Sequence, residues 1–386
     1  MQKNLERSPI GELVQIDGKR RAYVPGPLPR SIDLDGALVY ALDEASRAIS
    51  LLAGAGETFH NPDLLIRPFL SREAILSSRI EGTQSTLEDL FEYEASRRDR
   101  GDVMEVFNYV LALNKGLQMI RDAPINLWLV NSIHSTLMHD VRGRNKRPGQ
   151  LRNEQVYIGG EGQSIDQARF IPPPPYFVQE ALEDCVKFAN ERNHLPPLVQ
   201  CAMMHYQFET IHPYSDGNGR MGRLLIVLFL CARGVLTTPL LYLSAYFERD
   251  RQAYYDHLLR LSETGDWQRW LRYFLKGVTE ESRDALQRIR HVRDLHDSYK
   301  RLLLEKNESG NALHLLDEFF AQPVMTAPSA ARIIGITAKG AQRILERMTA
   351  LGIVKIEESR PRLYVAHELM DILQAPRALP PAMSRI

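Results

Sequence analysis

The chain has 386 residues, of which 44% are hydrophobic and 25% charged, and its 48 basic residues balance its 48 acidic residues. This length predicts two or three domains, and the neutral charge argues against a general attraction to nucleic acid or anionic membrane. The three cysteines give no disulfide framework, and the longest apolar run, Leu224 to Ala232, is too short to cross a membrane. We therefore expect a cytoplasmic protein without a membrane partner.

The first third of the chain combines a proline-rich start with helical patterns. Residues 1–36 lack a helical period, so we expect an extended arm there. Apolar residues then recur at three- and four-residue steps between Ile32 and Leu52, which predicts a helix. Further helices are expected over residues 64–78, 86–96, 103–120 and 126–137.

The middle of the chain combines a loop-rich segment with apolar helices. Residues 143–175 contain several glycines and four consecutive prolines. The β-prone run Gln155–Ile158 lies within them, so we expect a small β-hairpin flap. Helices are expected over residues 176–193, 198–211 and 220–233, and a long charged helix, with possible breaks, over about 266–305.

The chain changes character after a linker at residues 308–311. Three short helical patterns and two β-prone runs follow, which is the element order of a winged helix-turn-helix. We expect this module over residues 312–370 and a loose tail over 371–386.

The segment from His212 to Arg223 separates two helical patterns and could bind an anion. It reads His-Pro-Tyr-Ser-Asp-Gly-Asn-Gly-Arg-Met-Gly-Arg. Gly217 and Gly219 flank Asn218, so the backbone can turn tightly and approach a ligand closely. A helix begins directly afterwards, and the unpaired N–H groups of its first turn favour an anion.

The charged side chains of the same segment suit phosphoryl or nucleotidyl transfer. Arg220 and Arg223 share one helical face and are phosphate-binding residue types. Asp216 could hold a divalent metal on a polyphosphate, and His212 could act as a general base. The alternative interpretation is a polar loop between two core helices. A Walker P-loop is excluded because Gly-x4-Gly-Lys is absent.

This segment resembles the Fic family signature, His-x-Phe-x-(Asp/Glu)-Gly-Asn-Gly-Arg-x-x-Arg. Tyr214 replaces the usual phenylalanine, at a position that we expect to pack into the core. The resemblance extends over roughly residues 64–276 and implies a mainly α-helical Fic core over 101–305. It also implies transfer of AMP from ATP to a Ser, Thr or Tyr hydroxyl of target proteins and of the chain itself, with Mg²⁺ and as a homodimer.

The resemblance implies a role for each position of the signature. His212 would deprotonate the target hydroxyl, and Asp216 would bind Mg²⁺ between the α- and β-phosphates. The backbone of Gly217–Gly219 would cradle the phosphates, with the asparagine at its centre on the α-phosphate. Arg220 and Arg223 would neutralise the β- and γ-phosphates.

The resemblance also implies contacts outside the signature. The flap around Val156 and Tyr157 would align a target segment by strand addition, and Val156 would border the ATP site. Asp250, Arg251 and Tyr255 are candidates near the adenosine, although the asparagine that the family usually has there is not evident.

A second signature, Ser77-Ser78-Arg79-Ile80-Glu81-Gly82, matches the inhibitory motif (Ser/Thr)-x-x-x-Glu-(Gly/Asn) of the family. Its position before the catalytic signature resembles the class with an N-terminal inhibitory helix, so residues 1–100 would hold the arm and this helix. Ser77, Glu81 and Gly82 are its marked positions, and Glu81 would pair with Arg223 within the ATP site and keep the γ-phosphate from seating. The alternative interpretation is a helix end stopped by Gly82, and both can be true.

The C-terminal module carries a basic stripe formed by Lys339, Arg343 and Arg347, which are spaced by four residues on its third helical pattern. Such a stripe on a recognition helix is a DNA-reading arrangement, whereas the alternative is a solvated face. Two other functions therefore stay open: a nucleotide-sensing DNA-binding regulator, and a Fic relative that transfers or removes another phosphate-linked group.

Overall fold

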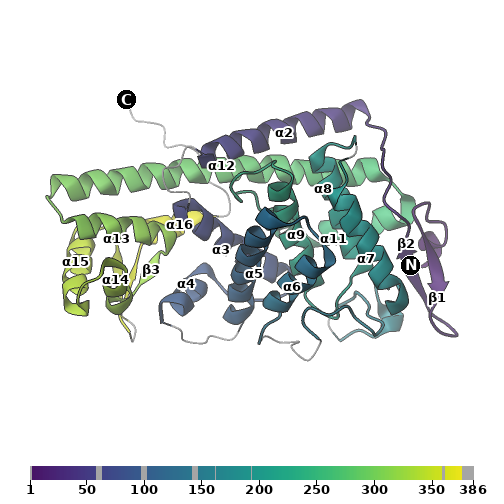
Figure 1. Ribbon diagram of the computed structural model, residues 1–386, viewed down its shortest axis with the longest axis horizontal. Helices are drawn as coiled ribbons and strands as arrows, with labels where there is room; N and C mark the ends of the chain where they lie inside the picture. The colour runs from purple at the N-terminus through teal and green to yellow at the C-terminus, as the bar shows by residue number, and fades with distance from the viewer. Residues whose placement is uncertain are drawn as a thin grey trace. The chain divides into compact units, whose positions relative to one another are not determined.

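Helices make up most of the computed structural model, which describes residues 2–57, 63–96, 102–140, 147–160, 162–192, 194–358 and 361–375 (Figure 1). The mainly α-helical class predicted from the sequence is confirmed. The chain divides into two units, and the first consists of Met1–Ser50, Asn108–Leu236 and Leu243–Glu280. The second consists of Leu51–Phe107, Thr237–Tyr242 and Glu281–Ile386. The domain boundaries predicted above stay a prediction.

The N-terminal arm differs from the extended stretch that we predicted. It contains a short helix, α1 (Gln2–Leu5), and an antiparallel hairpin of β1 (Gly11–Gln15) and β2 (Arg21–Pro25). The side chain of Asp17 accepts the N–H groups of Lys19 and Arg20, each at 2.9 Å, and so closes the turn. The signal in the sequence was Asp17-Gly18, a common hairpin turn, between two β-prone runs.

The first unit is built around two apolar helices. Its elements are most of α5 (Val103–Asp122), and α6 (Leu127–Leu137), α7 (Pro175–Asn190), α8 (Pro197–Ile211), α9 (Asn218–Ala232), α10 (Ser244–Arg249) and α11 (Arg251–Thr264). Helix α8 packs against both α7 and α9, and nearly all of its side chains are buried (Figure 1). Its buried His205 contacts the carbonyl oxygen of Gly222 at 3.2 Å and the hydroxyl of Tyr254 at 2.9 Å, so α8 is fixed at the centre.

The second unit contains the remaining elements. They are α3 (Asp63–Ile80), α4 (Leu87–Ser96), α13 (Gly310–Ala321), β3 (Val324–Met325), α14 (Ala327–Ile334), α15 (Ala338–Ala350), β4 (Lys355–Glu357), β5 (Leu363–Val365) and α16 (His367–Gln374). Two further helices, α2 (Gly36–Glu57) and α12 (Trp267–Glu305), have residues in both units, and so does α5, whose first five residues belong to the second unit. Helix α12 confirms the long charged helix, and it is continuous where the sequence left breaks possible.

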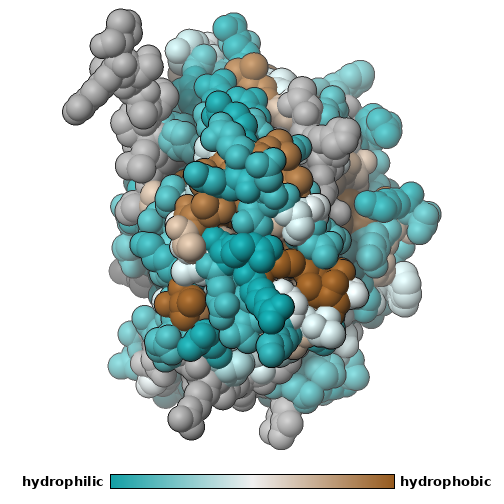
Figure 2. Space-filling view, turned by 90° about the vertical axis from the view of Figure 1, so that its left-hand side faces the viewer, coloured by the Kyte–Doolittle hydropathy of each residue, from teal (hydrophilic) through white to brown (hydrophobic). Residues whose placement is uncertain are grey.

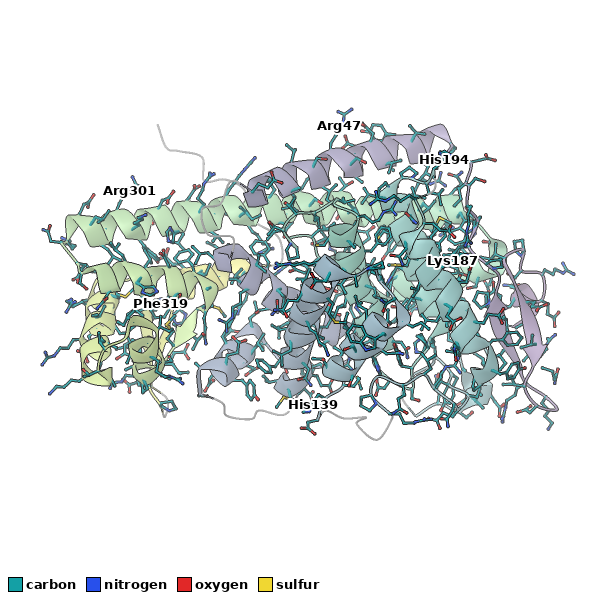
Figure 3. All side chains as sticks on the ribbon, viewed as in Figure 1. Arg47, His139, Lys187, His194, Arg301 and Phe319 are labelled. Carbon is teal, nitrogen blue, oxygen red and sulfur yellow. The ribbon has the colours of Figure 1, made fainter. Side chains whose placement is uncertain are left out.

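The C-terminal part of the second unit has the helices and hairpin strands that the sequence predicts. Strands β3, β5 and β4 form an antiparallel sheet in that order, although β3 and α16 were not predicted. Helix α16 continues to Gln374, inside the predicted tail, whose residues 376–386 lie outside the described ones. Phe319 on α13 is buried, whereas Arg301 on α12 points outward (Figure 3). The winged-helix assignment itself stays a prediction.

The exposed face at the end of the second unit is mostly hydrophilic, with separate hydrophobic patches (Figure 2). Among the described residues, no helix combines the length and apolar character needed to cross a membrane.

Candidate active site

His212 lies where α8 ends, and its backbone is in the left-handed region with φ of 51°. Its N–H donates to the carbonyl oxygen of Phe208 at 3.0 Å, as expected for a residue that stops a helix. Its Nδ1 lies 3.3 Å from the carbonyl oxygen of Glu209. When Nδ1 carries the proton and donates it to this oxygen, the basic lone pair is on Nε2.

The loop after His212 is closed by its own side chains. The amide of Asn218 accepts the N–H of Tyr214 and donates to its carbonyl oxygen, both at 2.8 Å. The ring of Tyr214 is fully buried, which confirms the expected core position, and its hydroxyl donates to Asn131 at 2.8 Å. This bond explains how the buried loop accommodates tyrosine where phenylalanine is usual.

Gly217 precedes α9 and is required for two reasons. Its φ of 76° is strained for other residues, and a Cβ atom there would lie 2.7 Å from the sulfur of Met138. Its N–H donates to Asp216 Oδ1 at 2.6 Å. The main chain at Gly219 follows in the first turn of α9, where N–H groups lack intrahelical acceptors.

Charged side chains of opposite sign meet at this helix start. The Asp216 carboxylate is 37% exposed and lies 3.6 Å from the guanidinium of Arg220, which is 4% exposed. Arg223, one turn further along α9, is also buried, at 2% exposure. Next to it, a Cβ atom on Gly222 would lie 2.2 Å from the carboxylate of Glu209, so glycine lets α8 and α9 approach closely.

His134 on α6 supports the loop, although no sequence pattern singles it out. Its Nδ1 accepts the N–H of Gly149 at 2.9 Å, so its Nε2 carries the proton and donates to the carbonyl oxygen of Asp216 at 3.0 Å. The ring stacks on Tyr214 with centroids 3.6 Å apart. Burial lowers the pKa of His134 to about 4, which keeps the ring neutral.

Arg152 is a second supporting residue that the sequence did not indicate. Its guanidinium donates to the carbonyl oxygens of His212 at 2.8 Å, Pro173 at 2.5 Å, and Ile211 and Glu154 at longer range. All four acceptors are main-chain groups, and burial lowers the pKa of Arg152 to about 10. A single arginine in a glycine- and proline-rich stretch carries no pattern that predicts its burial.

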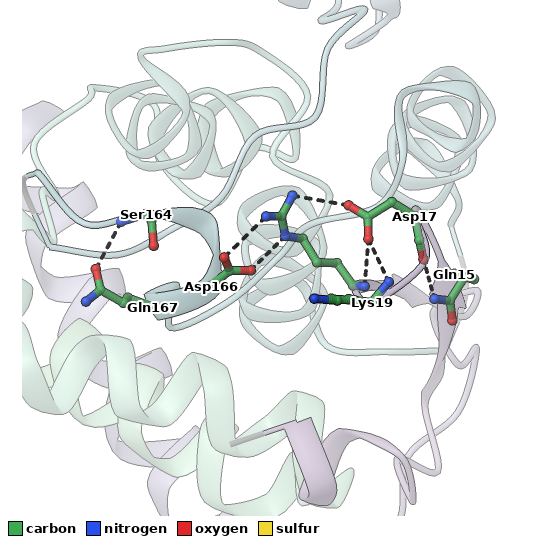
Figure 4. A network of polar contacts seen from close by, with 7 residues as sticks. Gln15, Asp17, Lys19, Ser164, Asp166 and Gln167 are labelled. Atoms are coloured by element: carbon green, nitrogen blue, oxygen red, sulfur yellow. Dashed lines mark hydrogen bonds and ion pairs between the residues drawn. The ribbon is translucent and has the colours of Figure 1, made fainter.

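The flap is less regular than the hairpin that we predicted. In the described residues it contains one antiparallel bridge, between Ile158 and Phe170. Val156 is half-buried, and the Tyr157 hydroxyl donates to the carbonyl oxygen of Gln163 at 2.8 Å. The N-terminal hairpin braces the flap, because Arg20 binds both Asp17 and Asp166 (Figure 4).

The candidates for adenosine contact lie around the start of α11. The side chain of Asp250 accepts the N–H of Ala253 at 2.9 Å and so caps this helix. The guanidinium of Arg251 lies over the ring of Tyr255, 5.5 Å from its centroid. Capping and stacking account for these three residues locally, and their contact with a nucleotide stays a prediction.

The candidate inhibitory residues lie at the end of α3, in the second unit. The N–H of Thr83 donates to Ser78 and that of Gly82 to Arg79, at 3.2 and 3.0 Å, which is a Schellman helix end. Gly82 has the φ of 100° that this end requires. Ser77 is buried and Glu81 is exposed. The helix-end interpretation is therefore confirmed, and pairing of Glu81 with Arg223 stays a prediction.

The basic stripe lies on α15, where Lys339, Arg343 and Arg347 are all exposed. Arg347 pairs with Glu308, with 2.9 Å between Nε and Oε2. Lys339 and Arg343 are therefore the stripe residues best able to contact a further anion.

Comparison with family models gives two adjacent matches. Residues 39–118 match the Fic/DOC family N-terminal model, and residues 124–230 match the Fic/DOC family model. The second match contains the loop with His212 and Asp216 together with both supporting residues, His134 and Arg152.

Comparison with curated proteins finds relatives named protein adenylyltransferase. One from Caenorhabditis elegans is 33% identical over 142 residues, which is 36% of this chain and 24% of that protein. One from Aquifex aeolicus, named as probable, is 24% identical over 312 residues, 76% of this chain and 86% of that protein. One from Drosophila mojavensis is 26% identical over 75% of this chain and 54% of its own length. The chain thus spans only a quarter to a half of the two animal proteins.

Solved structures show the same fold. A Fic family protein from Desulfovibrio desulfuricans superposes with a TM-score of 0.57 at 20% identity, covering 87% of this chain and 97% of that one. A Fic domain-containing signalling protein from Bacteroides thetaiotaomicron gives 0.52 at 17% identity, covering 64% and 97%.

Proposed function

The chain belongs to the Fic/DOC family through residues 39–118 and 124–230, and we propose that it transfers AMP from ATP to hydroxyl groups of proteins. The observation that carries the proposal is the loop between α8 and α9. A histidine, an accessible carboxylate, a helix start and two buried arginines follow one another there within twelve residues, counted from His212 to Arg223. The names of the relatives support the same reaction.

In the proposed reaction, His212 accepts the proton of the target hydroxyl through Nε2. The hydroxyl oxygen attacks the α-phosphorus of ATP, and pyrophosphate leaves. The main-chain N–H groups at the start of α9 and the guanidinium groups of Arg220 and Arg223 hold the phosphates. The hydrogen bond from His212 Nδ1 to Glu209 supports this role, because it orients the ring and fixes its tautomer.

The residues at Asp216 fit a magnesium ion that ATP brings with it. One carboxylate oxygen is occupied by the N–H of Gly217, and the group remains partly exposed. Among the described residues, no group of three or more His, Cys, Asp or Glu side chains is placed to hold a metal ion. Asp216 would therefore share the ion with phosphate oxygens and water, as is usual for Mg²⁺. When bound, the ion neutralises charge that develops on the phosphates.

The proposal is tested by incubating the protein with ATP and Mg²⁺ and measuring its intact mass. We expect a mass increase equal to one or more AMP groups, and His212→Ala should abolish it while ATP binding stays nearly unchanged. His194→Ala, which removes an exposed histidine (Figure 3), is the matched control and should behave like the unaltered chain. AMP transfer by His212→Ala at the normal rate would refute the role of His212. An adduct of another mass would indicate transfer of a different phosphate-linked group.

Three features are proposed beyond the reaction itself. Glu81 would inhibit the enzyme by pairing with Arg223, as the Ser77–Gly82 motif suggests. The main chain at Val156 and Tyr157 would receive the target segment. Arg152 supports this proposal, because it binds carbonyl oxygens of both His212 in the loop and Glu154 in the flap and so holds the flap next to the loop. A homodimer in the cytoplasm stays the expectation from the resemblance.

A second candidate function is DNA binding by the C-terminal module, with or without AMP transfer. The observation that favours it is the exposure of Lys339 and Arg343 on one face of α15.

A further inference from the structure

A cavity of about 610 Å³ lies in the first unit, formed by residues that the proposed reaction does not use. One wall is the proline-rich stretch after β2, from Gly26 to Asp33. The others are the turn before β1, the middle of α8 and the start of α12. Figure 1 shows the hairpin and the start of α12 at the same end of this unit. Its volume is typical of small-molecule sites, which hold about 300–1,000 Å³.

Hydrogen bonds and packing keep the cavity open. The side chain of Gln207 on α8 donates to the carbonyl oxygen of Gly26 at 3.0 Å, and Gln268 on α12 donates to that of Asp33. Gly265 closes one side, since a Cβ atom there would lie 2.5 Å from Pro9. The walls are thus fixed by contacts among themselves and need no ligand to form.

The charge of the lining has one sign. Asp33 and Asp266 both line the cavity and are exposed, so they form its rim. No lysine, arginine or histidine is among the lining residues in the described part of the chain. Inside, Gln268 Oε1 is a buried acceptor without a hydrogen-bond partner there. A ligand that donates hydrogen bonds and carries positive charge would satisfy all three groups.

The interior is aromatic and apolar. Trp267 and Tyr206 meet edge to face with ring centroids 5.3 Å apart, and the Tyr206 hydroxyl is already bonded to Ser262 at 2.8 Å. Ile32 and the neighbouring prolines and leucine complete the surface. Aromatic faces attract cations as well as apolar groups. We propose that this cavity binds a small organic cation, with an amidine, guanidine or amine head on an apolar body.

The test is isothermal titration of the full chain with benzamidine, with benzamide as its uncharged isostere. We expect saturable one-to-one binding of benzamidine that weakens with added salt, and at least about tenfold weaker binding of benzamide. This readout is independent of the proposed AMP transfer. Absence of saturable benzamidine binding, or equal affinity for benzamide, would overturn the proposal.

Three single variants and one double variant locate the binding. Asp33→Asn and Asp266→Asn should each weaken it about three- to fivefold because both carboxylates are exposed, and together about tenfold or more. Asparagine still caps α12 at position 266, where the side chain accepts the N–H of Arg269, so the fold should persist. Trp267→Leu should weaken binding about five- to tenfold through the lost aromatic face. Asp122→Asn, an exposed carboxylate outside the cavity, is the matched control. Unchanged affinity in both the double variant and Trp267→Leu, or an equal loss in the control, would contradict the proposal.

Discussion

Arg152 and His134 hold the backbone of the loop that carries the proposed base. Both do so through hydrogen bonds to main-chain carbonyl oxygens and not through charged side chains. Arg152 binds the carbonyl oxygen of His212, whose positive φ costs about 1–2 kcal/mol for a non-glycine residue. His134 holds the carbonyl oxygen of Asp216 from the other side. The position of the base therefore depends on two side chains that take no part in the proposed chemistry.

Arg152→Lys should lower the rate of AMP transfer by about 10- to 100-fold. A lysine keeps the charge but cannot reach several carbonyl oxygens in the fixed geometry of a guanidinium. We expect kcat to fall more than the affinity for ATP, because the phosphate-binding residues on α9 are unchanged. The matched control is Arg169→Lys, which should change the rate of AMP transfer little. Arg169 lies in the flap and pairs with Asp256 on α11. A loss of ATP affinity without a loss of kcat would indicate a different role for Arg152.

The low pKa of His134 makes stability depend on pH. The folded pKa is about 4, whereas the unfolded value is 6.5, so the unfolded chain binds a proton that the folded chain does not. This proton uptake lowers stability as pH falls from about 6.5 towards 4, by up to about 1.4 kcal/mol per pH unit. The melting temperature should therefore fall more steeply between pH 7 and pH 5 in the unaltered chain than in His134→Gln. Parallel pH profiles would show that His134 takes up no proton on unfolding.

The candidate site residues that the sequence indicated lie within one short segment, His212 to Arg223. His212, Asp216 and Arg220 could be recognised because their spacing alone suggests phosphate chemistry. His134 and Arg152 could not, because they precede their loop partners by 82 and 60 residues and contact main-chain atoms. Every residue type carries a main-chain carbonyl oxygen, so the sequence contains no complementary residue that would reveal these contacts.

At the scale of elements, the end of α3 combines an observed role, ending the helix, with a proposed one, inhibition by Glu81. Gly82 ends the helix. The Glu81 side chain is exposed and takes no part in the Schellman hydrogen bonds, which join main-chain groups. Glu81→Gly should raise auto-adenylylation about 10- to 100-fold if this carboxylate restrains the enzyme. Gly82→Ala is the matched control, because it strains the same helix end and keeps the carboxylate. An equal gain in both variants would assign the effect to helix fraying rather than to Glu81.

The helices were predicted more accurately than the strands. The apolar character of α8 and α9 located both helices, because nearly all of their side chains are buried in the first unit. The hairpin of β1 and β2 was missed because its arm is short and rich in proline and glycine, although Asp17-Gly18 was a usable turn signal. The flap was predicted as a hairpin, but its prolines lack N–H groups, and its described residues contain one bridge, between Ile158 and Phe170.

At the scale of the whole molecule, zero net charge conceals a local asymmetry. Acidic groups line the cavity rim in the first unit, and exposed basic groups lie on α15 in the second. Composition alone averages these regions, so it argues against nucleic acid without excluding a local contact. A test of DNA binding must therefore remove charge from α15 and use a control variant that removes the same charge elsewhere.

The double variant Lys339→Ala/Arg343→Ala should weaken binding of the full chain to a genomic DNA library at low salt. Each cation that contacts a phosphate contributes about 0.9 to the slope of log affinity against log salt, so the slope should fall by about 2. Arg347→Ala should change it less, because Arg347 already pairs with Glu308. Lys300→Ala/Arg301→Ala removes the same charge from exposed positions on α12 and serves as the control. Equal losses in both double variants would indicate a general charge effect. Absence of binding by the unaltered chain would leave α15 with a solvated basic face and AMP transfer as the one function proposed.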